Sequence, residues 1–506
     1  MIMDMKNILK YTLAAGAAVS IFASCDLDLT PTTSIAYEEG GRLFISANDI
    51  KSFENGIMAS YRALQYGDYT QTSESQTDYF NATVEYGNNY GSTHRCDPSF
   101  TPGTYEPMYL WRDHYTAIKN YNIVIANADN VEASLRASAR VLKGEAYFLR
   151  ASSYIILARH FAKAYNPSSA DNDLCVPLVL KYDQLEKPAR ATNKAVYEQI
   201  KTDLDSAAVL LAGVKGAVRA QKPTIDAVNA LYARYYLDVQ NYTEAAKAAE
   251  SVINSAAGYA LASTPEEMAA EYTDDKGTEP IIQLYASISE GARANDMYTY
   301  VSNSQDVGKY FSPYFLPTKA LIDSYNATDL RLSTWYTNDL YPVRSSGSYY
   351  TGVYVLTKYL DNPALHSGSV ETGAHAAKPL LISEMYLIAA EAYAKAGNSA
   401  KATAALNVLQ DKRMAATTSG TMENIKKEWF KETVGEGLRF SCVKRWGEGF
   451  AVRTPQAEAK NLIMSGDYYE KRALSADSYF LNWPVPAYEI QLNKNLIQNA
   501  GYTTAE

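Results

Sequence analysis

The strongest constraint on the fold is the stretch from Ser138 to Tyr165, which has the sequence SARVLKGEAYFLRASSYIILARHFAKAY. Two neighbouring sets of mostly apolar or small residues recur in it at steps of three and four, the spacing that places side chains along one face of an α-helix. Two adjacent apolar stripes indicate burial on more than one side. Small residues such as Gly144, Ala151 and Ala158 allow neighbouring helices to approach closely. The stretch therefore predicts the central helix of an all-helical core.

A second pattern occurs twice, once on each side of the middle of the chain. In each copy a small residue, a tyrosine, an alanine and another apolar residue are separated by three, nine and four positions, which is the spacing of a tetratricopeptide hairpin. Gln240-Asn241 and Gly397-Asn398 supply the turns. Because the two units are not adjacent, we expect tetratricopeptide-like helix pairs but no regular solenoid. The positions are Ala233, Tyr236, Ala245 and Ala249, and Ala390, Tyr393, Ala402 and Leu406.

Two long stretches, approximately 65–107 and 257–378, break the helical pattern and are rich in tyrosine and polar residues. The chain has 42 tyrosines against 13 phenylalanines, and a tyrosine ring combines apolar area with a polar tip. Such a long aromatic loop region is typical of a functional segment. We therefore predict a mainly α fold, in which a helical scaffold carries an irregular loop lobe with a few short strands. The scaffold is expected at approximately 48–64, 109–256 and 380–447, and a C-terminal segment at 448–506.

The first 24 residues have the pattern of an export signal. Lys6 and Lys10 form a short basic region, and the apolar run that follows, from Tyr11 to Phe22, is too short to span a bilayer. Cys25 closes this run directly after small residues, as in the bacterial lipobox, where the cysteine is acylated. We therefore expect residues 1–24 to be a signal peptide and Cys25 to carry the lipid anchor.

Charge and motifs exclude several classes of function. The formal net charge of −9 provides no basic surface for nucleic acid. The remaining cysteines, Cys96, Cys175 and Cys442, form no CxxC pair, so a zinc site is not expected, and their disulfide pairing stays open. The five histidines form no HExxH motif, and the chain has no GxSxG, GxGxxG or Walker loop. We therefore expect no catalytic residue, no cofactor and no metal, with a structural calcium at Asp274–Gly277 as the one alternative left open.

The C-terminal third contains a group of charged and aromatic residues that we interpret as a structural ion-pair network, with arginine stacked on tryptophan. A rigid extended segment, Trp483–Pro486, follows it and is expected to dock on the core. The charged group consists of Glu436, Arg439, Lys444, Arg445 and Trp446.

These motifs, in this order, resemble the SusD/RagB family of outer-membrane lipoproteins from Bacteroidetes. The resemblance runs from Cys25 to Tyr502, through CDLDL, LWRDHYTAIKNYNIVIAN, GEAYFLRASSYIILARHF, AEAYAKAG, ALNVLQDKR, GEGLRF, KRWG and NWPVP. It implies one SusD-like domain over residues 25–506, anchored in the outer membrane through its lipid and exposed on the cell surface. It also implies a partner, a SusC-like TonB-dependent transporter, and a ligand that is a glycan or, in some members, a peptide.

The expected function is capture of an oligosaccharide and its delivery to the transporter, which this protein covers as a lid. Aromatic rings stack on sugar faces, and polar side chains bond the ring hydroxyls. We expect the scaffold to bring the two tyrosine-rich stretches to one face. An oligopeptide ligand, a protein-binding tetratricopeptide scaffold and a glycoside hydrolase remain alternatives. The predicted ligand residues are Asp78, Tyr86, Tyr90, Arg95, Tyr300, Trp335 and Tyr349.

Overall fold

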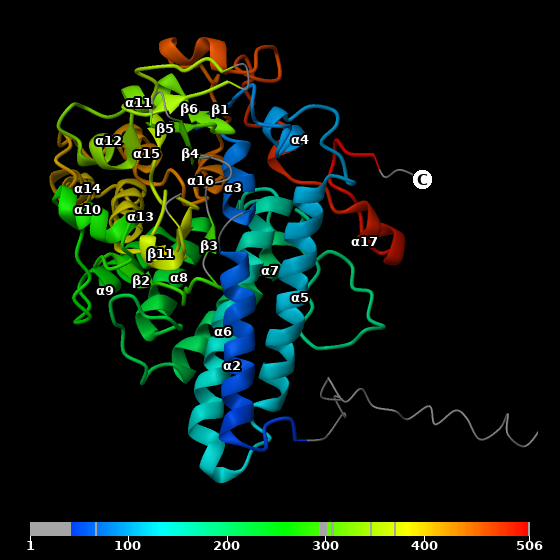
Figure 1. The fold of residues 1–506 in the computed structure, drawn as a ribbon. Helices are drawn as coiled ribbons and strands as arrows, with labels where there is room; N and C mark the ends of the chain where they lie inside the picture. The colour runs from blue at the N-terminus through cyan, green and yellow to red at the C-terminus, as the bar shows by residue number, and fades with distance from the viewer. Residues whose placement is uncertain are drawn as a thin grey trace, which may run out of the picture.

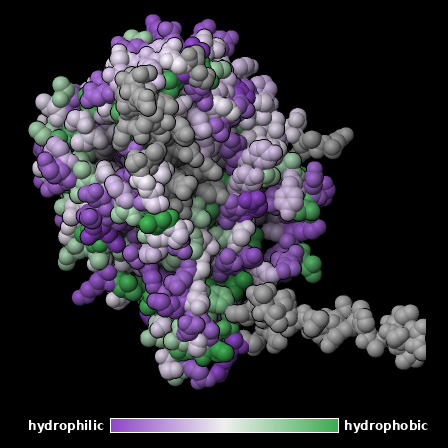
Figure 2. Space-filling view, in the orientation of Figure 1, coloured by the Kyte–Doolittle hydropathy of each residue, from purple (hydrophilic) through white to green (hydrophobic). Residues whose placement is uncertain are grey.

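A computed structural model provides the fold. It is mainly α-helical, with a few short strands in small sheets, as the sequence predicts (Figure 1). Figure 2, in the same orientation, shows hydrophobic residues scattered among hydrophilic ones on this face. No helix among the described residues is both long and apolar enough to cross a lipid bilayer. The predicted signal peptide, Cys25 and Tyr300 lie outside the described residues, which are 42–65, 68–290, 292–293, 301–304, 308–344, 347–368 and 371–503.

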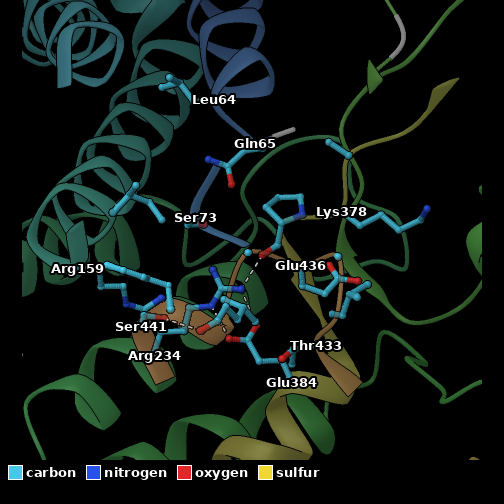
Figure 3. Close-up of a pocket in the computed structure, with 18 of the residues that line it drawn as sticks. Leu64, Gln65, Ser73, Arg159, Arg234, Lys378, Glu384, Thr433, Glu436 and Ser441 are labelled. Atoms are coloured by element: carbon cyan, nitrogen blue, oxygen red, sulfur yellow. Dashed lines mark hydrogen bonds and ion pairs between the residues drawn. The ribbon is translucent and has the colours of Figure 1, made fainter. Parts of the chain in front are cut away.

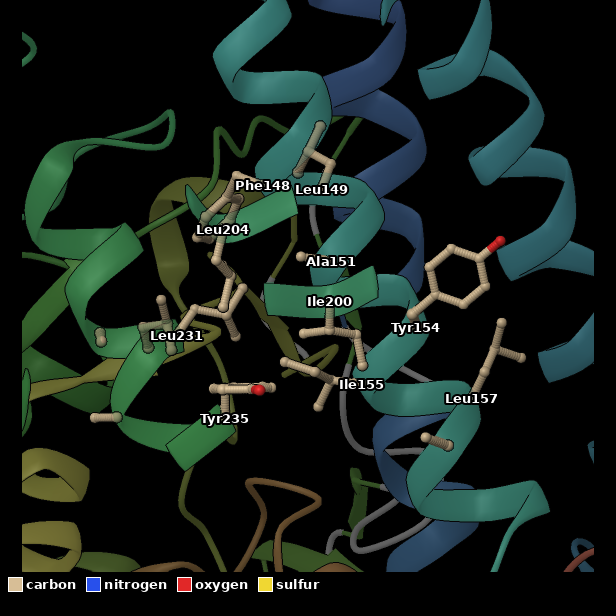
Figure 4. Close-up of a cluster of buried hydrophobic side chains, with 14 of the residues drawn as sticks. Phe148, Leu149, Ala151, Tyr154, Ile155, Leu157, Ile200, Leu204, Leu231 and Tyr235 are labelled. Atoms are coloured by element: carbon tan, nitrogen blue, oxygen red, sulfur yellow. The ribbon is translucent and has the colours of Figure 1, made fainter. Parts of the chain in front are cut away.

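Four long helices build the first part of the scaffold. Figure 1 shows α2, α5 and α6 side by side, and α6 also packs against α7. α6 is the predicted central helix, and most of its side chains are buried. Its Ile155 lies beside Ile200 of α7 in the apolar cluster of Figure 4. The bounds of the four helices are Ala47–Leu64 for α2, Tyr105–Asn127 for α5, Arg136–Phe161 for α6 and Asn193–Leu210 for α7.

The two predicted hairpins form as expected. Each second helix is capped by an asparagine, because the side chain of Asn241 accepts a hydrogen bond from the backbone of Glu244, and Asn398 caps its helix in the same way. Gln240 and Gly397 adopt the left-handed conformation that the turns require, with φ of 63° and 79°. α13 packs against α9, so the two hairpins lie together although they are distant in sequence. The hairpins are α8 (Ile225–Asp238) with α9 (Tyr242–Ile253), and α13 (Ile382–Lys395) with α14 (Ser399–Lys412).

A short two-stranded sheet joins the two tyrosine-rich stretches. β1 (Phe80–Ala82) comes from the first stretch, and β6 (Phe315–Pro317) comes from the second. The strands are antiparallel, with Phe80 opposite Pro317. This pairing brings both stretches into one lobe.

The other elements of the lobe are short helices and strands. The helices are α3 (Asp68–Ser75), α4 (Gly91–Arg95), α10 (Pro265–Tyr272), α11 (Lys319–Asp323) and α12 (Leu330–Trp335). The strands are β2 (Pro280–Ile282), β3 (Ala292–Arg293), β4 (Val301–Ser304), β5 (Gly308–Phe311), β7 (Tyr336–Thr337), β8 (Tyr341–Pro342), β9 (Val355–Leu356), β10 (Ala374–His375) and β11 (Leu380–Leu381).

The lobe has a hydrophobic core of its own, and much of it is aromatic. Tyr79, Tyr272, Trp335 and Tyr359 are all buried in it. The ammonium nitrogen of Lys358 lies 3.9 Å from the centroid of the Trp335 ring, close enough for a cation–π contact. Many tyrosines of the two stretches therefore hold the lobe together and are not available to a ligand.

The predicted ion pairs at the C-terminal end form for Arg439, Arg445 and Glu436, whereas Lys444 donates to backbone oxygens of Arg159 and Ala162. The residues follow α15 (Met422–Glu432) and extend through α16 (Arg439–Trp446). Arg445 and the indole nitrogen of Trp446 both bond Glu391 of α13, at 2.8 and 2.9 Å. The Trp483 segment docks on the core as expected, since its indole is fully buried and donates to Gln76 at 2.8 Å. A last short helix, α17 (Ala487–Leu492), follows.

Candidate functional site

The loop between β1 and α4 folds three of the predicted ligand residues into one cluster. Its residues Gly87, Asn88 and Tyr90 have φ between 54° and 61°, in the left-handed region that few residues adopt. Such backbone persists where surrounding contacts fix it, and it is frequent at ligand sites. Here the contacts come from Arg95 and Tyr86.

Arg95 is the centre of this cluster. Its guanidinium pairs with Asp97 at 2.5 Å and donates to the side-chain oxygens of Asn88 and Tyr86 at 2.7 and 3.2 Å. The Tyr86 hydroxyl also lies 2.9 Å from that of Tyr469. Burial raises the pKa of Tyr86 to about 12, so the hydroxyl keeps its proton at neutral pH. Tyr90 follows in the same loop, and its ring centroid lies 6.4 Å from that of Phe315.

Beside this cluster lies a hollow with exposed aromatic walls, which we call the tyrosine surface. Its volume is about 220 Å³. The rings of Tyr105 and Tyr109 stack 5.8 Å apart at 22°, and they are 66% and 41% exposed. The guanidinium carbon of Arg112 lies 4.6 Å from the Tyr109 ring centroid. The hollow is lined by Thr72, Asn89, Tyr90, Tyr105, Glu106, Tyr109 and Leu110.

The composition of the tyrosine surface suits a flat, hydroxyl-rich ligand. Two exposed rings provide a platform on which a flat ligand can stack. Exposed aromatic area of this kind is typical of an interaction site. Asn89 and Glu106 place amide and carboxylate groups at its edge. A few polar groups around an aromatic floor are the usual makeup of a small-molecule site.

Two family models match the chain. The model of the SusD family matches residues 234–502, and a model described as starch-binding associating with outer membrane matches residues 37–237. The first of these matches alone spans more than half of the 506 residues. The chain belongs to the SusD family. A comparison with curated proteins gives no match.

Solved structures of the SusD superfamily share this fold. A putative sugar binding protein from Bacteroides vulgatus is 24% identical, with a TM-score of 0.73 over 92% of this chain and 100% of its own. A SusD superfamily protein from Bacteroides thetaiotaomicron is 22% identical, with a TM-score of 0.75 over 90% of this chain and 100% of its own. A laminarin binding SusD-like protein is 19% identical, with a TM-score of 0.71 over 91% of this chain and 100% of its own. At these identities the likeness establishes the SusD-like fold.

Three of the predicted ligand residues of this SusD-family chain belong to its interior. Tyr86 is 5% exposed and packs in the lobe core. Trp335 is fully buried in the lobe core, beneath Lys358. Asp78 is 5% exposed, and its carboxylate pairs with Arg439 at 2.8 and 2.9 Å. All three predictions are corrected, because these side chains present almost no surface to a ligand. Tyr349 is 37% exposed, and its backbone forms an isolated antiparallel β-bridge with Val343.

Sequence reasoning missed the most exposed part of the tyrosine surface. The sequence predicts Tyr105 within the loop and Tyr109 at the start of a helix. In the structure α5 begins at Tyr105, so both residues belong to its first turns. Their spacing of four places them on the same helical face, and that signal could have identified the pair.

The three cysteines and the stretch left open for calcium make contacts within the protein. Cys96, Cys175 and Cys442 are buried free thiols. Asp275, within the stretch left open for calcium, bonds Lys378 at 2.5 Å and Asn362 at 2.7 Å. The described ranges contain no group of three or more histidine, cysteine or acidic residues that could hold a metal ion.

Proposed function

We propose that this protein is a lipid-anchored, surface-exposed component of the outer membrane that binds an oligosaccharide and passes it to a SusC-like TonB-dependent transporter, which it covers as a lid. The observation that carries the proposal is the stacked, exposed pair Tyr105 and Tyr109, with Tyr90 and polar groups around one hollow. Stacking of a planar ligand on an aromatic ring contributes about 1–3 kcal/mol per ring, by analogy with nucleic-acid bases.

Relatives support the ligand class and the location. Two proteins of the same fold are described as sugar binding and as laminarin binding. The family model over residues 37–237 refers to starch binding and to the outer membrane. Cys25, directly after an apolar run, supports a lipid as the anchor.

The geometry favours a glycan over the alternatives. Peptide capture commonly uses an open strand edge or apolar pockets, whereas the tyrosine surface is a helix face with polar edges. A glycoside hydrolase needs two carboxyl groups across the scissile bond. Among the described residues that line the hollow, Glu106 is the only carboxylate.

A glycan and peptide array with the chain lacking residues 1–25 tests the ligand class. We expect binding to one group of glycans and none to peptides. Binding to peptides alone would support the oligopeptide alternative. Release of new reducing ends from a bound glycan would instead indicate a hydrolase.

The lid role is tested by recovery of the partner. A tagged full-length chain, purified from its own membranes in mild detergent, is expected to retain a large outer-membrane barrel protein. Closure of a lid buries the ligand between two proteins, so adding the ligand should increase the amount retained. Failure to recover a barrel in several detergents would argue against the lid.

A further inference from the structure

Two arginines near the centre of the molecule have their charges balanced by carboxylates. Figure 3 shows one of them in the wall of a cavity between the scaffold and the lobe, where Arg234 bonds Glu384 at 2.6 Å through both carboxylate oxygens. Arg159, in the same wall, bonds Asp238 at 2.9 and 3.1 Å. These cations are satisfied within the protein, whereas several cations at the lower end of the scaffold are not.

That lower end, which we call the scaffold tip, is where the described chain begins and where α2 and α6 both start (Figure 1). Two contacts join its segments. Arg42 pairs with Glu132, and the guanidinium of Arg140 donates to the backbone oxygen of Val209 at 2.7 Å. The scaffold tip consists of residues 42–51, residues 129–143 and Val209 in the last turn of α7.

The scaffold tip is basic although the chain as a whole is acidic. Its two segments contain five lysines and arginines against three acidic residues, while the formal net charge of the chain is −9. All three carboxylates have partners within the tip. Asp49 caps the start of α2, Asp129 bonds Lys143 at 2.5 Å, and Glu132 pairs with Arg42.

The other three cations of the tip are exposed and have no carboxylate partner among the described residues. They are Lys51, Arg136 and Arg140. Two aliphatic side chains are exposed on the same tip, Ile45 at 70% and Val209 at 65%. Basic groups around exposed apolar side chains are typical of a surface that lies on an anionic membrane, where the cations meet phosphates and the apolar groups enter the headgroup boundary.

The position of the proposed lipid anchor favours the same partner. Arg42, the first described residue, follows Cys25 by 17 residues. A fully extended chain of that length spans no more than about 60 Å, so the anchor keeps the tip close to the bilayer. Salt screens charges beyond about 8 Å, so the charges of the contacting face decide whether an acidic protein can rest on an anionic surface.

We infer that the scaffold tip docks on the anionic lipid headgroups of the outer membrane. The inference rests on the proposed function, because it uses the lipid anchor at Cys25. Docking would also orient the ligand site. α5 runs from the tyrosine surface toward the tip and has 23 residues, a length of about 35 Å, so the tyrosine surface would stand clear of the lipid.

The test tethers the chain lacking residues 1–25 to vesicles, through an N-terminal histidine tag and a nickel-chelating lipid. The described fold begins at Arg42, so this removal leaves it whole. A polarity-sensitive dye is attached at Ser134→Cys, in the exposed turn η1 (Ala133–Leu135), since the three other cysteines that remain are buried.

We expect the dye emission to shift to the blue on phosphatidylcholine vesicles that contain phosphatidylglycerol. The shift should be absent on phosphatidylcholine alone, and high salt should abolish it. A shift on both kinds of vesicle, on neither kind, or one that resists salt would overturn the inference.

Two double variants with the same change in net charge locate the contact. Arg136→Glu/Arg140→Glu should lose the shift. Lys460→Glu/Lys494→Glu, which alters two exposed lysines outside the tip, should keep it. Equal shifts in the two variants would contradict docking by the tip. The salt dependence of the unaltered chain gives the answer even if a variant fails to fold.

Glycan binding by the same tethered chains separates this inference from the proposed ligand site. The tip and the tyrosine surface share no residue, so both double variants should bind an array-identified glycan as the unaltered chain does. Absence of docking with intact glycan binding would remove the inference and leave oligosaccharide capture standing.

Discussion

Among single residues, Glu145 on α6 links the stability of the scaffold to pH. It is 2% exposed, and its Oε2 atom receives no hydrogen bond from the part of the chain that the structure describes. Burial, together with the nearby Glu54, raises the pKa of Glu145 to about 8. The folded protein therefore holds a proton at neutral pH that the unfolded chain releases.

The sign of the pH dependence follows from that raised pKa. The contribution of Glu145 to stability is fully present below its unfolded pKa, near 4.5, and is lost as pH rises toward 8. Glu145→Gln removes the titration, so the variant should be more stable than the unaltered chain at pH 8, by on the order of 2–4 kcal/mol. Urea unfolding at pH 5 and pH 8 measures the difference. An equal offset at both values would show that Glu145 does not titrate in this range.

At the scale of elements, Gly144 sets how closely α6 approaches the end of α7. A Cβ atom built at Gly144 would lie 2.8 Å from Leu211 Cγ and 2.9 Å from Leu210 Cβ. Gly56 in α2 is also within a helix, but a Cβ atom there meets no atom within 4 Å. The two glycines thus provide a matched pair of sites for the same substitution.

Alanine should have opposite effects at these two positions. Gly144→Ala forces neighbouring side chains apart and should lower the free energy of unfolding by about 1–3 kcal/mol. Gly56→Ala should raise it by roughly 0.5–1 kcal/mol, because alanine favours a helix without a clash. Denaturant unfolding of both variants tests the packing of α6. Stabilisation by Gly144→Ala would mean that the helices are not in close contact there.

The helices were readable from sequence because their signals are local. The apolar period of α6, the repeated hairpin spacing and the turns at Gln240 and Gly397 each depend on a few neighbouring residues. The cluster of Tyr86 and Arg95 was readable for the same reason, since one short loop brings them together.

The rest of the site depends on long-range packing. Tyr90 and Trp335 both come from tyrosine-rich loop sequence, and no local pattern separates a residue that lines a surface from one that fills a core. Trp335 becomes buried because Tyr272 and Lys358, distant in sequence, pack against it. Asp78 likewise meets its partner Arg439 only in the folded chain.

At the scale of the whole molecule, buried ion pairs tie the lobe to the scaffold. Arg331 of α12 and Arg413 beyond α14 both pair with Glu432 of α15, at 2.8 and 2.6 Å. Although burial opposes its ionisation, Arg413 and Arg331 lower the pKa of Glu432 to about 2. Removing one partner of such a buried pair typically costs about 3–5 kcal/mol. The network therefore joins the lobe to the scaffold.

The central claim is that the tyrosine surface binds an oligosaccharide. Its most direct test is calorimetric titration of an array-identified glycan into the unaltered chain and into Tyr105→Ala/Tyr109→Ala, with thermal melts in parallel. Tyr488→Ala is a matched control, since Tyr488 is 53% exposed on α17. We predict that the double variant loses about 1–3 kcal/mol of binding free energy per ring, while its melting temperature and the affinity of the control are unchanged. Undiminished affinity in the double variant would contradict the claim.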